Sequence, residues 1–288
     1  MTGQGCLVNW QAGSLPYIPL MDASEIQRVA ERMLADYDAR RPNELFAERG
    51  TDWLTLDDAY AVQRAMAKLR RARGERCLGY KVGCVSPAVQ NQLNLRQPVR
   101  GLLWDTEVHV SECRLSKRNF VGLAVEGEIA VRLRQDISTK ASTSLKDLTD
   151  CLEYWFPVIE LHNRVFRGPK PTSQELVAGN AMHAGFVAAP GSENPCVAAL
   201  AQADIRVEID GKLAETSNVA SLPGGPLGSL RWLAFALARE GQTLRAGDVV
   251  LTGSPGRLVP VQAGSAVSVT SEGQSVRFFA ESYLGPPA

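Results

Sequence analysis

The sequence predicts an α+β fold in which a small helical N-terminal part packs on a larger β-rich part. Before about residue 75, apolar residues recur at helical spacing. From about residue 100, short β-like runs alternate with turn signals instead. No internal repeat or low-complexity linker separates the two halves. We therefore predict a helical part over residues 1–75 and a β-rich catalytic part over residues 76–288, without a flexible hinge between them.

The predicted helices of the first part have recognisable ends. The first begins after Asp22 or Ser24, either of which can cap it, and continues to about residue 37. The second begins at Thr55, which opens a capping box, and Gly74 ends it. Ser86-Pro87 opens a short third helix, with serine as the cap and proline in the first turn. Residues 1–20 have no period and are expected to be irregular.

The β-rich part consists of short strands separated by turns. Asp210-Gly211 is a strong hairpin signal between two of them. One helix interrupts the strands over residues 227–240, and Gly241 ends it. The eight predicted strands span residues 107–110, 123–133, 156–161, 185–187, 205–209, 248–252, 266–270 and 276–279.

Composition excludes several classes of protein. Apolar residues make up 45% of the 288 residues, which allows a sizeable core. Lys plus Arg equals Asp plus Glu at 31 each, so no net charge draws the chain to nucleic acid or to an anionic membrane. None of the 6 cysteines forms a Cys-x-x-Cys pair, which is typical of free thiols in a reducing compartment. Without a signal-peptide pattern or a membrane-length apolar run, we predict a cytoplasmic protein.

Three glutamates lie in otherwise apolar, strand-like runs. Glu126 and Glu128 share one face of their run, about 7 Å apart along the backbone. Two like charges this close repel unless a cation lies between them, although a Glu-x-Glu pair alone is typical of a solvated face. Glu160 follows three apolar residues and a proline, where a carboxylate is costly unless it is paired or bound to a cation. Alone, Glu160 fits a salt bridge as well as it fits a ligand.

Taken together, the three carboxylates suit a hard divalent cation such as Mg²⁺ or Mn²⁺. Such a site leaves coordination positions for water and for a chelating substrate. Lys81, between two glycines, offers a cation for an anionic substrate, although by itself the pattern fits an ordinary surface lysine. His162 shares the face of Glu160 and is either a structural histidine or a base beside the metal. His109 and His183 carry no signal.

Four short segments occur in order along the chain: Gly79-Tyr-Lys-Val-Gly83 with Ser86 and Val89-Gln90 after it, Val125-Glu-Gly-Glu-Ile-Ala130, Pro157-Val-Ile-Glu160, and Leu244-Arg-Ala-Gly-Asp-Val-Val-Leu-Thr-Gly-Ser254. In combination they resemble the 2-keto-4-pentenoate hydratase family of the fumarylacetoacetate hydrolase superfamily. That family includes 2-hydroxypentadienoate hydratases and 4-oxalocrotonate decarboxylases. The resemblance covers roughly residues 22–280.

This resemblance implies a mixed β-roll with flanking helices, like the C-terminal domain of fumarylacetoacetase, with a metal at its mouth. It implies that Glu126, Glu128 and Glu160 bind Mg²⁺ or Mn²⁺. The substrate would be a small anionic 2-hydroxy-2,4-dienoate or its 2-oxo tautomer. The metal would stabilise the C2 enolate, a general acid would protonate the far carbon, and water would add to C4. The expected activity is that of a hydro-lyase in aromatic compound catabolism, in a homo-oligomer.

The resemblance also implies roles for four further positions. Lys81 would contact the substrate carboxylate or carry a proton, with Asp105 as its acid–base partner. On its own pattern, Asp105 fits a turn cap equally well. The backbone of Gly253 and the side chain of Ser254 would line the substrate pocket.

The chain also departs from the family pattern near the expected site. Many relatives carry Asp three residues after the last glutamate and Arg two residues further on, where this chain has Asn163 and Val165. We place Asn163 in the substrate pocket. Gly225 stands where relatives tend to carry Asn or His. The metal–enolate half of the chemistry is therefore expected to be intact, while the substrate's length and substituents stay open.

Three other functions remain open on the sequence. A 2-oxo-dioate decarboxylase of the 4-oxalocrotonate type would use the same electron sink to release CO₂. An acylpyruvate C–C hydrolase usually needs a His–Glu pair to activate water, and the lack of a Glu-x-x-His pattern argues against it. A non-catalytic subunit would bind metal without turnover and form a stable complex with an enzyme of the same pathway.

Overall fold

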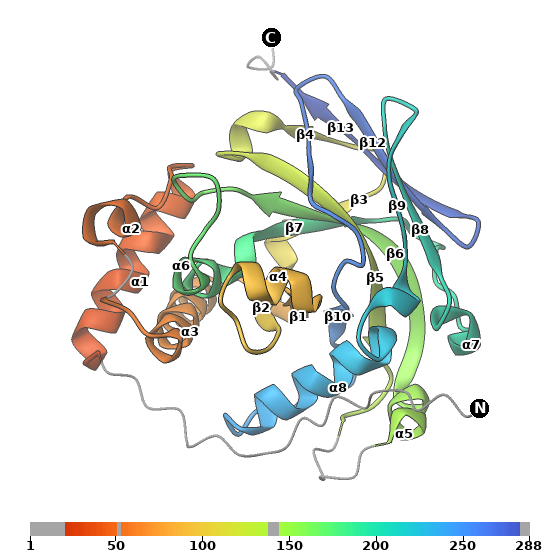
Figure 1. The fold of residues 1–288 in the computed structure, drawn as a ribbon, viewed down its shortest axis with the longest axis horizontal. Helices are drawn as coiled ribbons and strands as arrows, with labels where there is room; N and C mark the ends of the chain where they lie inside the picture. Colours follow the sequence, from red (N-terminus) through yellow and green to blue (C-terminus); the bar gives the residue numbers. More distant parts are fainter. Residues whose placement is uncertain (1–20, 51–52, 138–143, 283–288) are drawn as a thin grey trace.

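The fold combines two curled β-sheets with helices around them, as a computed structural model of residues 21–50, 53–137 and 144–282 shows (Figure 1). The predicted irregular segment over residues 1–20 lies outside the described residues. In the first sheet the strand order is β2 (Val99–Trp104), β1 (Cys77–Gly83), β10 (Val249–Leu251), β5 (Leu123–Leu133), β6 (Leu152–Asn163), β7 (His183–Ala188) and β3 (Val108–Val110), and β11 (Val259–Pro260) pairs with β5. Parallel and antiparallel pairs both occur, which confirms a mixed sheet.

The second sheet has the order β4 (Cys113–Ser116), β13 (Gln274–Glu281), β12 (Ala266–Ser271), β8 (Asp204–Ile209) and β9 (Lys212–Asn218). The predicted hairpin joins β8 to β9, and both Asp210 and Gly211 adopt positive φ, as a tight hairpin turn requires. The sequence analysis did not identify β4, which has 4 residues, or β9, which has 7. The two sheets pack face to face around a core of aliphatic and aromatic residues that includes Ile129, Ile159 and Phe278.

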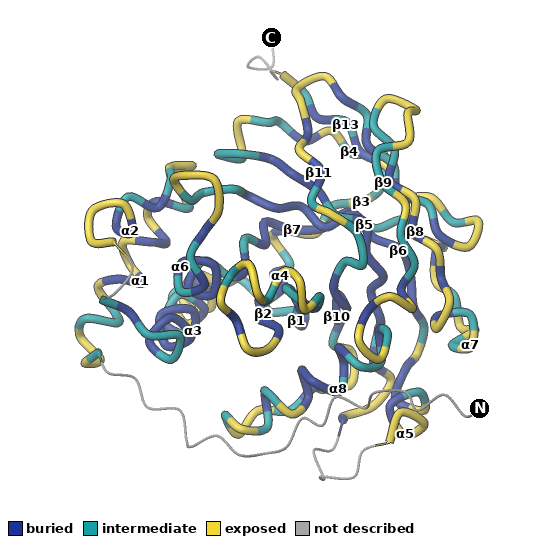
Figure 2. The backbone as a smooth tube through the Cα atoms, in the orientation of Figure 1, coloured by how far each residue is buried: buried dark blue, intermediate teal, exposed yellow. Residues whose placement is uncertain are grey.

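The two sheets approach each other closely at Gly127, between the two glutamates of β5. A Cβ atom there would lie 2.6 Å from Cγ2 of Ile205 and 2.9 Å from Cγ2 of Val207, both on β8. Because side chains alternate along β5, the face that carries Glu126 and Glu128 is the one turned away from the second sheet. β5 and β6 are buried over most of their length (Figure 2). The glutamates therefore sit on strands that are largely shielded from solvent.

Helices α1 (Ala23–Asp38), α2 (Glu44–Arg49) and α3 (Leu56–Ala72) form a second hydrophobic core together with α6 (Ser173–Ala178). Asp22 caps α1, and Thr55 forms the predicted capping box of α3 with Asp58. The N-terminal helices thus share their core with an element that follows more than 100 residues later. The proposed boundary at residue 75 stays a prediction.

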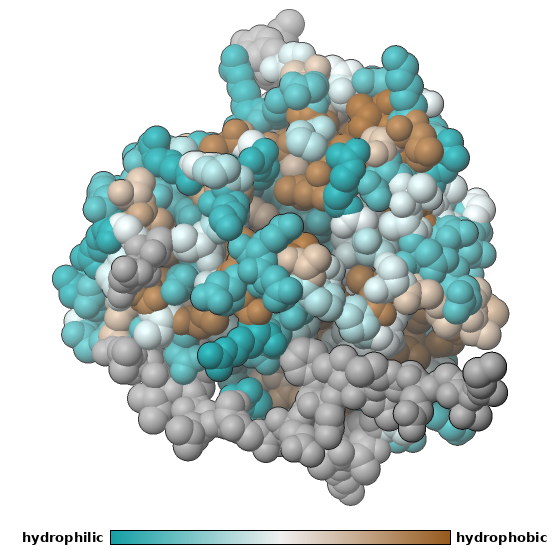
Figure 3. Space-filling view, viewed as in Figure 1, coloured by the Kyte–Doolittle hydropathy of each residue, from teal (hydrophilic) through white to brown (hydrophobic). Residues whose placement is uncertain are grey.

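The remaining helices lie around the sheets. Ser86 caps α4 (Pro87–Gln92), as predicted, and α8 (Gly225–Ala238) is the long helix predicted over residues 227–240. The short helices α5 (Leu145–Asp150) and α7 (Val197–Leu200) were not predicted. Hydrophilic residues cover much of the face in Figure 3, with apolar residues exposed in small groups between them. Among the described residues, no helix has the length and apolar character needed to cross a membrane.

Candidate active site

The pairing of β5 with β6 brings the three glutamates together. Glu126 lies directly opposite Glu160 in this antiparallel pair, and Glu128 lies two residues further along the same face. The side chains of Glu128 and Glu160 are fully buried, whereas the side chain of Glu126 is 20% exposed. The spacing of two residues therefore predicted correctly that Glu126 and Glu128 share a face of β5, and the register of β5 with β6 adds Glu160 to that face.

Glu160 lies at the centre of the cluster and uses both of its oxygens. Its Oε1 lies 3.2 Å from Nζ of Lys81 and 2.6 Å from Nδ1 of His183. Its Oε2 lies 3.2 Å from Nε2 of His162. Burial alone would raise the pKa of this carboxyl, but the charges of Lys81 and His162 hold the pKa of Glu160 well below its ordinary value. Glu160 is therefore a buried carboxylate that is ionised and held in one orientation.

Lys81 is a buried cation on β1, the strand between β2 and β10. Gly83, next but one along β1, leaves room for it, because a Cβ there would lie 3.0 Å from Nζ of Lys81. Gly79 serves the strand pairing instead, because a Cβ there would lie 2.0 Å from the carbonyl oxygen of Val249. Burial alone would lower the pKa of Lys81, but the nearby carboxylates, that of Glu160 foremost, raise this pKa above its ordinary value. Lys81 therefore keeps its positive charge in the interior.

Glu128 is linked to the segment that follows β10. Its Oε2 accepts a hydrogen bond of 3.0 Å from the backbone N–H of Gly253, while its Oε1 is buried without a hydrogen-bond partner among the described residues. Ser254 donates its hydroxyl to the carbonyl oxygen of Gly127 at 3.2 Å. Burial, and then the charge of Glu160, raises the pKa of Glu128 well above its ordinary value. The predicted pair Gly253 and Ser254 is thus attached to the strand that carries the glutamates.

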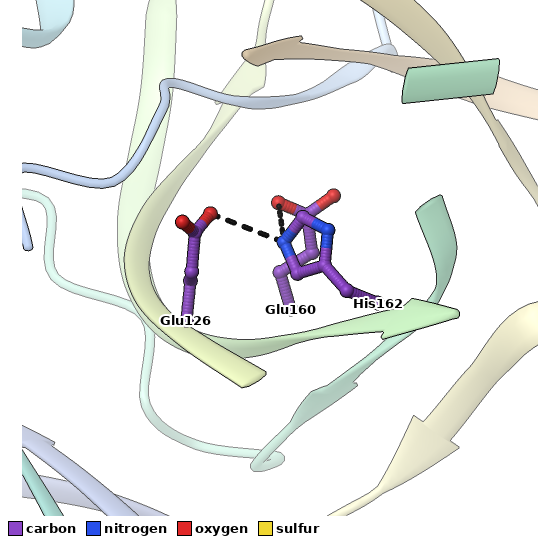
Figure 4. Close-up of side chains that lie close together, drawn as sticks. All are labelled: Glu126, Glu160 and His162. Atoms are coloured by element: carbon purple, nitrogen blue, oxygen red, sulfur yellow. Dashed lines mark hydrogen bonds and ion pairs between the residues drawn. The ribbon is translucent and has the colours of Figure 1, made fainter. Parts of the chain in front are cut away.

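His162 faces the carboxylates from β6. Its Nε2 lies 3.1 Å from Oε2 of Glu126 and 3.2 Å from Oε2 of Glu160 (Figure 4). Burial alone would lower the pKa of the imidazole, but the charges of Glu160 and Glu126 raise the pKa of His162 to about 9. Glu126, Glu160 and His162 each place one potential ligand atom within 4.8 Å of the other two. The sequence analysis left open whether this histidine is structural or belongs to the site, and the structure places it at the carboxylates.

The donor atoms of this cluster fit a divalent cation. Oε1 of Glu128 and Oε2 of Glu160 are buried oxygens without a hydrogen-bond partner among the described residues. Buried carboxylate oxygens of this kind are costly unless a cation or a hydrogen-bond donor satisfies them. Oxygen atoms from carboxylates, with one imidazole nitrogen beside them, are common ligands of divalent metals. Glu126, Glu160 and His162 therefore form the candidate metal centre, and Glu128 lies beside this group and is not one of its members.

Asp105 and Asn163 have other contacts. The carboxylate of Asp105 accepts hydrogen bonds from the backbone N–H and from Nε of Arg76, at 2.9 and 2.8 Å. In the pairing of β1 with β2, Lys81 lies opposite Gly101, so Asp105 is roughly 13 Å further along the strand. Oδ1 of the buried Asn163 accepts from the backbone N–H groups of Val121 and Gly122. No contact between either residue and Lys81 or the glutamates appears in the described part of the chain, so their functional roles stay predictions.

Two further residues beside the cluster carried no signal in the sequence. His183 reaches Glu160 because β7 pairs with β6, with His183 opposite His162. Cys84 follows β1 with φ 54°, and burial raises the pKa of its thiol to about 11 although Lys81 opposes this shift. The His–Glu contacts also correct one argument of the sequence analysis. The absence of a Glu-x-x-His pattern does not exclude a His–Glu pair, because separate strands supply one here.

Comparison with known proteins identifies similar chains. A family model described as fumarylacetoacetate (FAA) hydrolase C-terminal matches residues 98–277. A 2-hydroxyhexa-2,4-dienoate hydratase of Comamonas testosteroni is 32% identical over 76% of this chain and 84% of that protein. A 2-keto-4-pentenoate hydratase of Paraburkholderia phymatum is 34% identical over 75% of this chain and 82% of that protein.

A solved structure has the same fold. The 4-oxalocrotonate decarboxylase from Pseudomonas putida G7, complexed with magnesium and adipate, superimposes with a TM-score of 0.85. The match covers 91% of this chain and 100% of that one at 24% sequence identity. This likeness confirms the predicted mixed β-roll with flanking helices, and the matches together confirm the resemblance drawn from the four segments.

Proposed function

We propose that this chain, which belongs to the fumarylacetoacetate hydrolase family, is a metal-dependent hydro-lyase. It hydrates a 2-hydroxy-2,4-dienoate of the 2-oxo-4-pentenoate type to a 4-hydroxy-2-oxo acid. The observation that carries the proposal is the meeting of Glu126, Glu128 and Glu160 with the buried cation Lys81. The curated hydratases that are more than 30% identical to the chain support the same chemistry.

The three glutamates would hold the divalent cation, Mg²⁺ or Mn²⁺. When bound, the cation supplies Lewis acidity where negative charge develops on the C2 oxygen of the substrate. Glu160 is ready for this role, because Lys81 and His183 fix its Oε1 while Oε2 lies beside Nε2 of His162. Glu126 is the one glutamate of the three that solvent reaches, which puts the open side of the site next to it.

Lys81 attracts the anionic substrate and holds its carboxylate. Its raised pKa keeps Nζ protonated at neutral pH, so in the resting site it acts as a fixed positive charge. Glu128 is the carboxyl in the cluster that binds a proton most readily, because burial and the charge of Glu160 both favour its neutral form. Because Glu128 would also bind the cation, it would lose this proton on metal binding, and Lys81 with Asp105 stays the proposed proton carrier.

The test is a spectrophotometric assay with freshly generated 2-hydroxypenta-2,4-dienoate, with Mg²⁺ or Mn²⁺ and then with EDTA. Wild type is expected to consume the dienol and form 4-hydroxy-2-oxopentanoate only with metal. Glu126→Gln keeps the size of the side chain but removes its charge, and kcat/KM should fall by about 10²–10³-fold. Glu153→Gln, an exposed change on the same strand pair, is the matched control and should retain activity.

Other outcomes would identify the alternative functions. CO₂ release from a 2-oxo-dioate, without dienoate hydration, would make the chain a decarboxylase. Cleavage of an acylpyruvate into two acids would make it a C–C hydrolase, for which the His–Glu contacts supply a possible base. Stoichiometric metal binding without turnover of any of the three substrates would refute catalysis and favour a partner subunit in a complex with a pathway enzyme.

Two narrower proposals can be tested with the same protein. If Asp105 is the acid–base partner of Lys81, Asp105→Asn should lower kcat by about 10²-fold or more. A change of less than twofold would leave it as the partner of Arg76 alone. A homo-oligomer, as proposed from the family resemblance, would elute at a multiple of 31.2 kDa in size-exclusion chromatography with light scattering.

A further inference from the structure

His162 presents Nε2 to two carboxylates at the spacing of metal ligands. Adjacent ligand atoms of an octahedral site with bonds of about 2.1 Å are about 3.0 Å apart. Nε2 of His162 lies 3.1 Å from Oε2 of Glu126 and 3.2 Å from Oε2 of Glu160, two edges of nearly this length. Figure 4 shows the imidazole beside both carboxylates, with dashed lines from one ring nitrogen to an oxygen of each.

A hydrogen bond explains only one of these two contacts. An N–H donor prefers one acceptor nearly in line with it, and hydrogen bonds weaken steeply as the angle decreases. Nε2 of His162 forms such a bond with Oε2 of Glu126, whereas Oε2 of Glu160, 3.2 Å from the same nitrogen, has no hydrogen-bond partner among the described residues. A cation bound by all three groups would satisfy this buried oxygen as well.

His183 provides an internal comparison. It is also buried and also contacts Glu160, but through Nδ1 and at the other oxygen, Oε1, which Lys81 shares. That contact orients the carboxylate, as groups behind a metal ligand commonly do. The two histidines therefore lie on different oxygens of one glutamate, and of the two it is His162 that also contacts Glu126.

We infer that His162 is a fourth protein ligand of the metal, bound through Nε2 beside the carboxylates, and that the site therefore prefers Mn²⁺ to Mg²⁺. The inference rests on the proposed function, since it concerns the same metal centre. Imidazole suits transition metals, whereas Mg²⁺ strongly prefers oxygen ligands. Four protein ligands also leave two of six positions, the number that a chelating 2-oxo acid occupies through its carboxylate and C2 oxygen.

The experiment uses untagged protein and Mn²⁺ as the probe. Binding is followed by the loss of the free Mn²⁺ signal in electron paramagnetic resonance, and pulsed spectra are recorded for nitrogen-14 modulation from a coordinated imidazole. His162→Gln is compared with wild type, and His183→Gln is the matched control because it alters a buried histidine on the same glutamate. Mg²⁺ affinity is measured by competition with Mn²⁺.

Wild type and His183→Gln should show imidazole modulation, and His162→Gln should lose it. Mn²⁺ affinity should fall about 10- to 100-fold in His162→Gln, and Mg²⁺ affinity should fall less. In wild-type protein produced with nitrogen-15 histidine, the modulation from nitrogen-14 should be replaced by that from nitrogen-15. This measurement does not depend on whether a variant folds.

Two results would overturn the inference. Wild type that binds one Mn²⁺ without imidazole modulation, or His162→Gln that keeps it, would remove His162 from the ligands while leaving the metal centre in place. Wild type that binds no Mn²⁺ and no Mg²⁺ would refute the metal centre of the proposed function itself.

Discussion

Replacing Gly127 with alanine tests whether the close approach of the two sheets explains the glycine between the glutamates. The added Cβ would lie 2.6 and 2.9 Å from methyl carbons of Ile205 and Val207, where carbon atoms normally stay about 3.5–4.0 Å apart. Ile205 is fully buried and Val207 nearly so, so both must move by about 1 Å within a packed core. Overpacking of this kind costs about 1–3 kcal/mol.

The assay for this variant is urea unfolding together with calorimetry. The free energy of unfolding of Gly127→Ala should fall by about 1–3 kcal/mol, which lowers Tm by about 2–6 °C in a chain of this size. Ile205→Ala alone should cost about 2–5 kcal/mol because it leaves a cavity. In the double variant the new methyl group enters that space, so the combined loss should be at least about 1 kcal/mol smaller than the sum. A Gly127→Ala effect below about 0.5 kcal/mol, or strict additivity, would refute the packing argument.

Three further changes have expected outcomes. Lys81→Met leaves the carboxylate of Glu160 buried without its cation, so metal-free protein should lose about 3–5 kcal/mol in urea unfolding, and a loss below 1 kcal/mol would contradict this role. Burial raises the pKa of Glu175 to about 7 from an ordinary 4.5, so the folded state binds the proton of this carboxyl more tightly than the unfolded state does. Wild type therefore loses stability as pH rises from about 4.5 to about 7. Glu175→Gln should therefore gain about 1–2 kcal/mol over wild type between pH 4.5 and pH 8, after discounting for solvent, and a Tm difference independent of pH would exclude the shift. Ser254→Ala removes the hydrogen bond from the Ser254 hydroxyl to the carbonyl oxygen of Gly127, so the free energy of unfolding should fall by about 1 kcal/mol. If KM rises as well, the hydroxyl lies at the substrate.

Periodicity and spacing predicted much of the fold. Helical spacing and caps located α1 and α3, and alternation placed Glu126 and Glu128 on one face. Helices α2, α5, α6 and α7 were missed because four to six residues are too few to establish a helical period. These errors did not affect the fold class, because the long elements determine it.

The site was predictable only where local pattern or family resemblance reached it. The register that sets Glu160 opposite Glu126 joins strands whose sequence separation no local signal spans, so these residues were linked only by their shared carboxylate chemistry and by the family resemblance. His183 reaches the cluster through the pairing of β7 with β6, which nothing near it in the sequence encodes. Asp105 differs from His183, because the family resemblance did assign it a role. In the structure its carboxylate forms an ion pair with Arg76, and its functional role stays a prediction.

The order of the strands has a consequence for synthesis on the ribosome. β1 needs β10 as its parallel neighbour, with Lys81 opposite Leu251, and β4 needs β13, with Cys113 opposite Phe278. Each pair joins segments separated by more than 150 residues, so neither sheet can be completed until late in translation. Until then β1 and β4 expose unpaired strand edges, and Gly253 is not in place to bind Glu128. We therefore expect nascent chains that stop before β10 to be recognised by chaperones and to hold the metal-binding glutamates in an incomplete sheet.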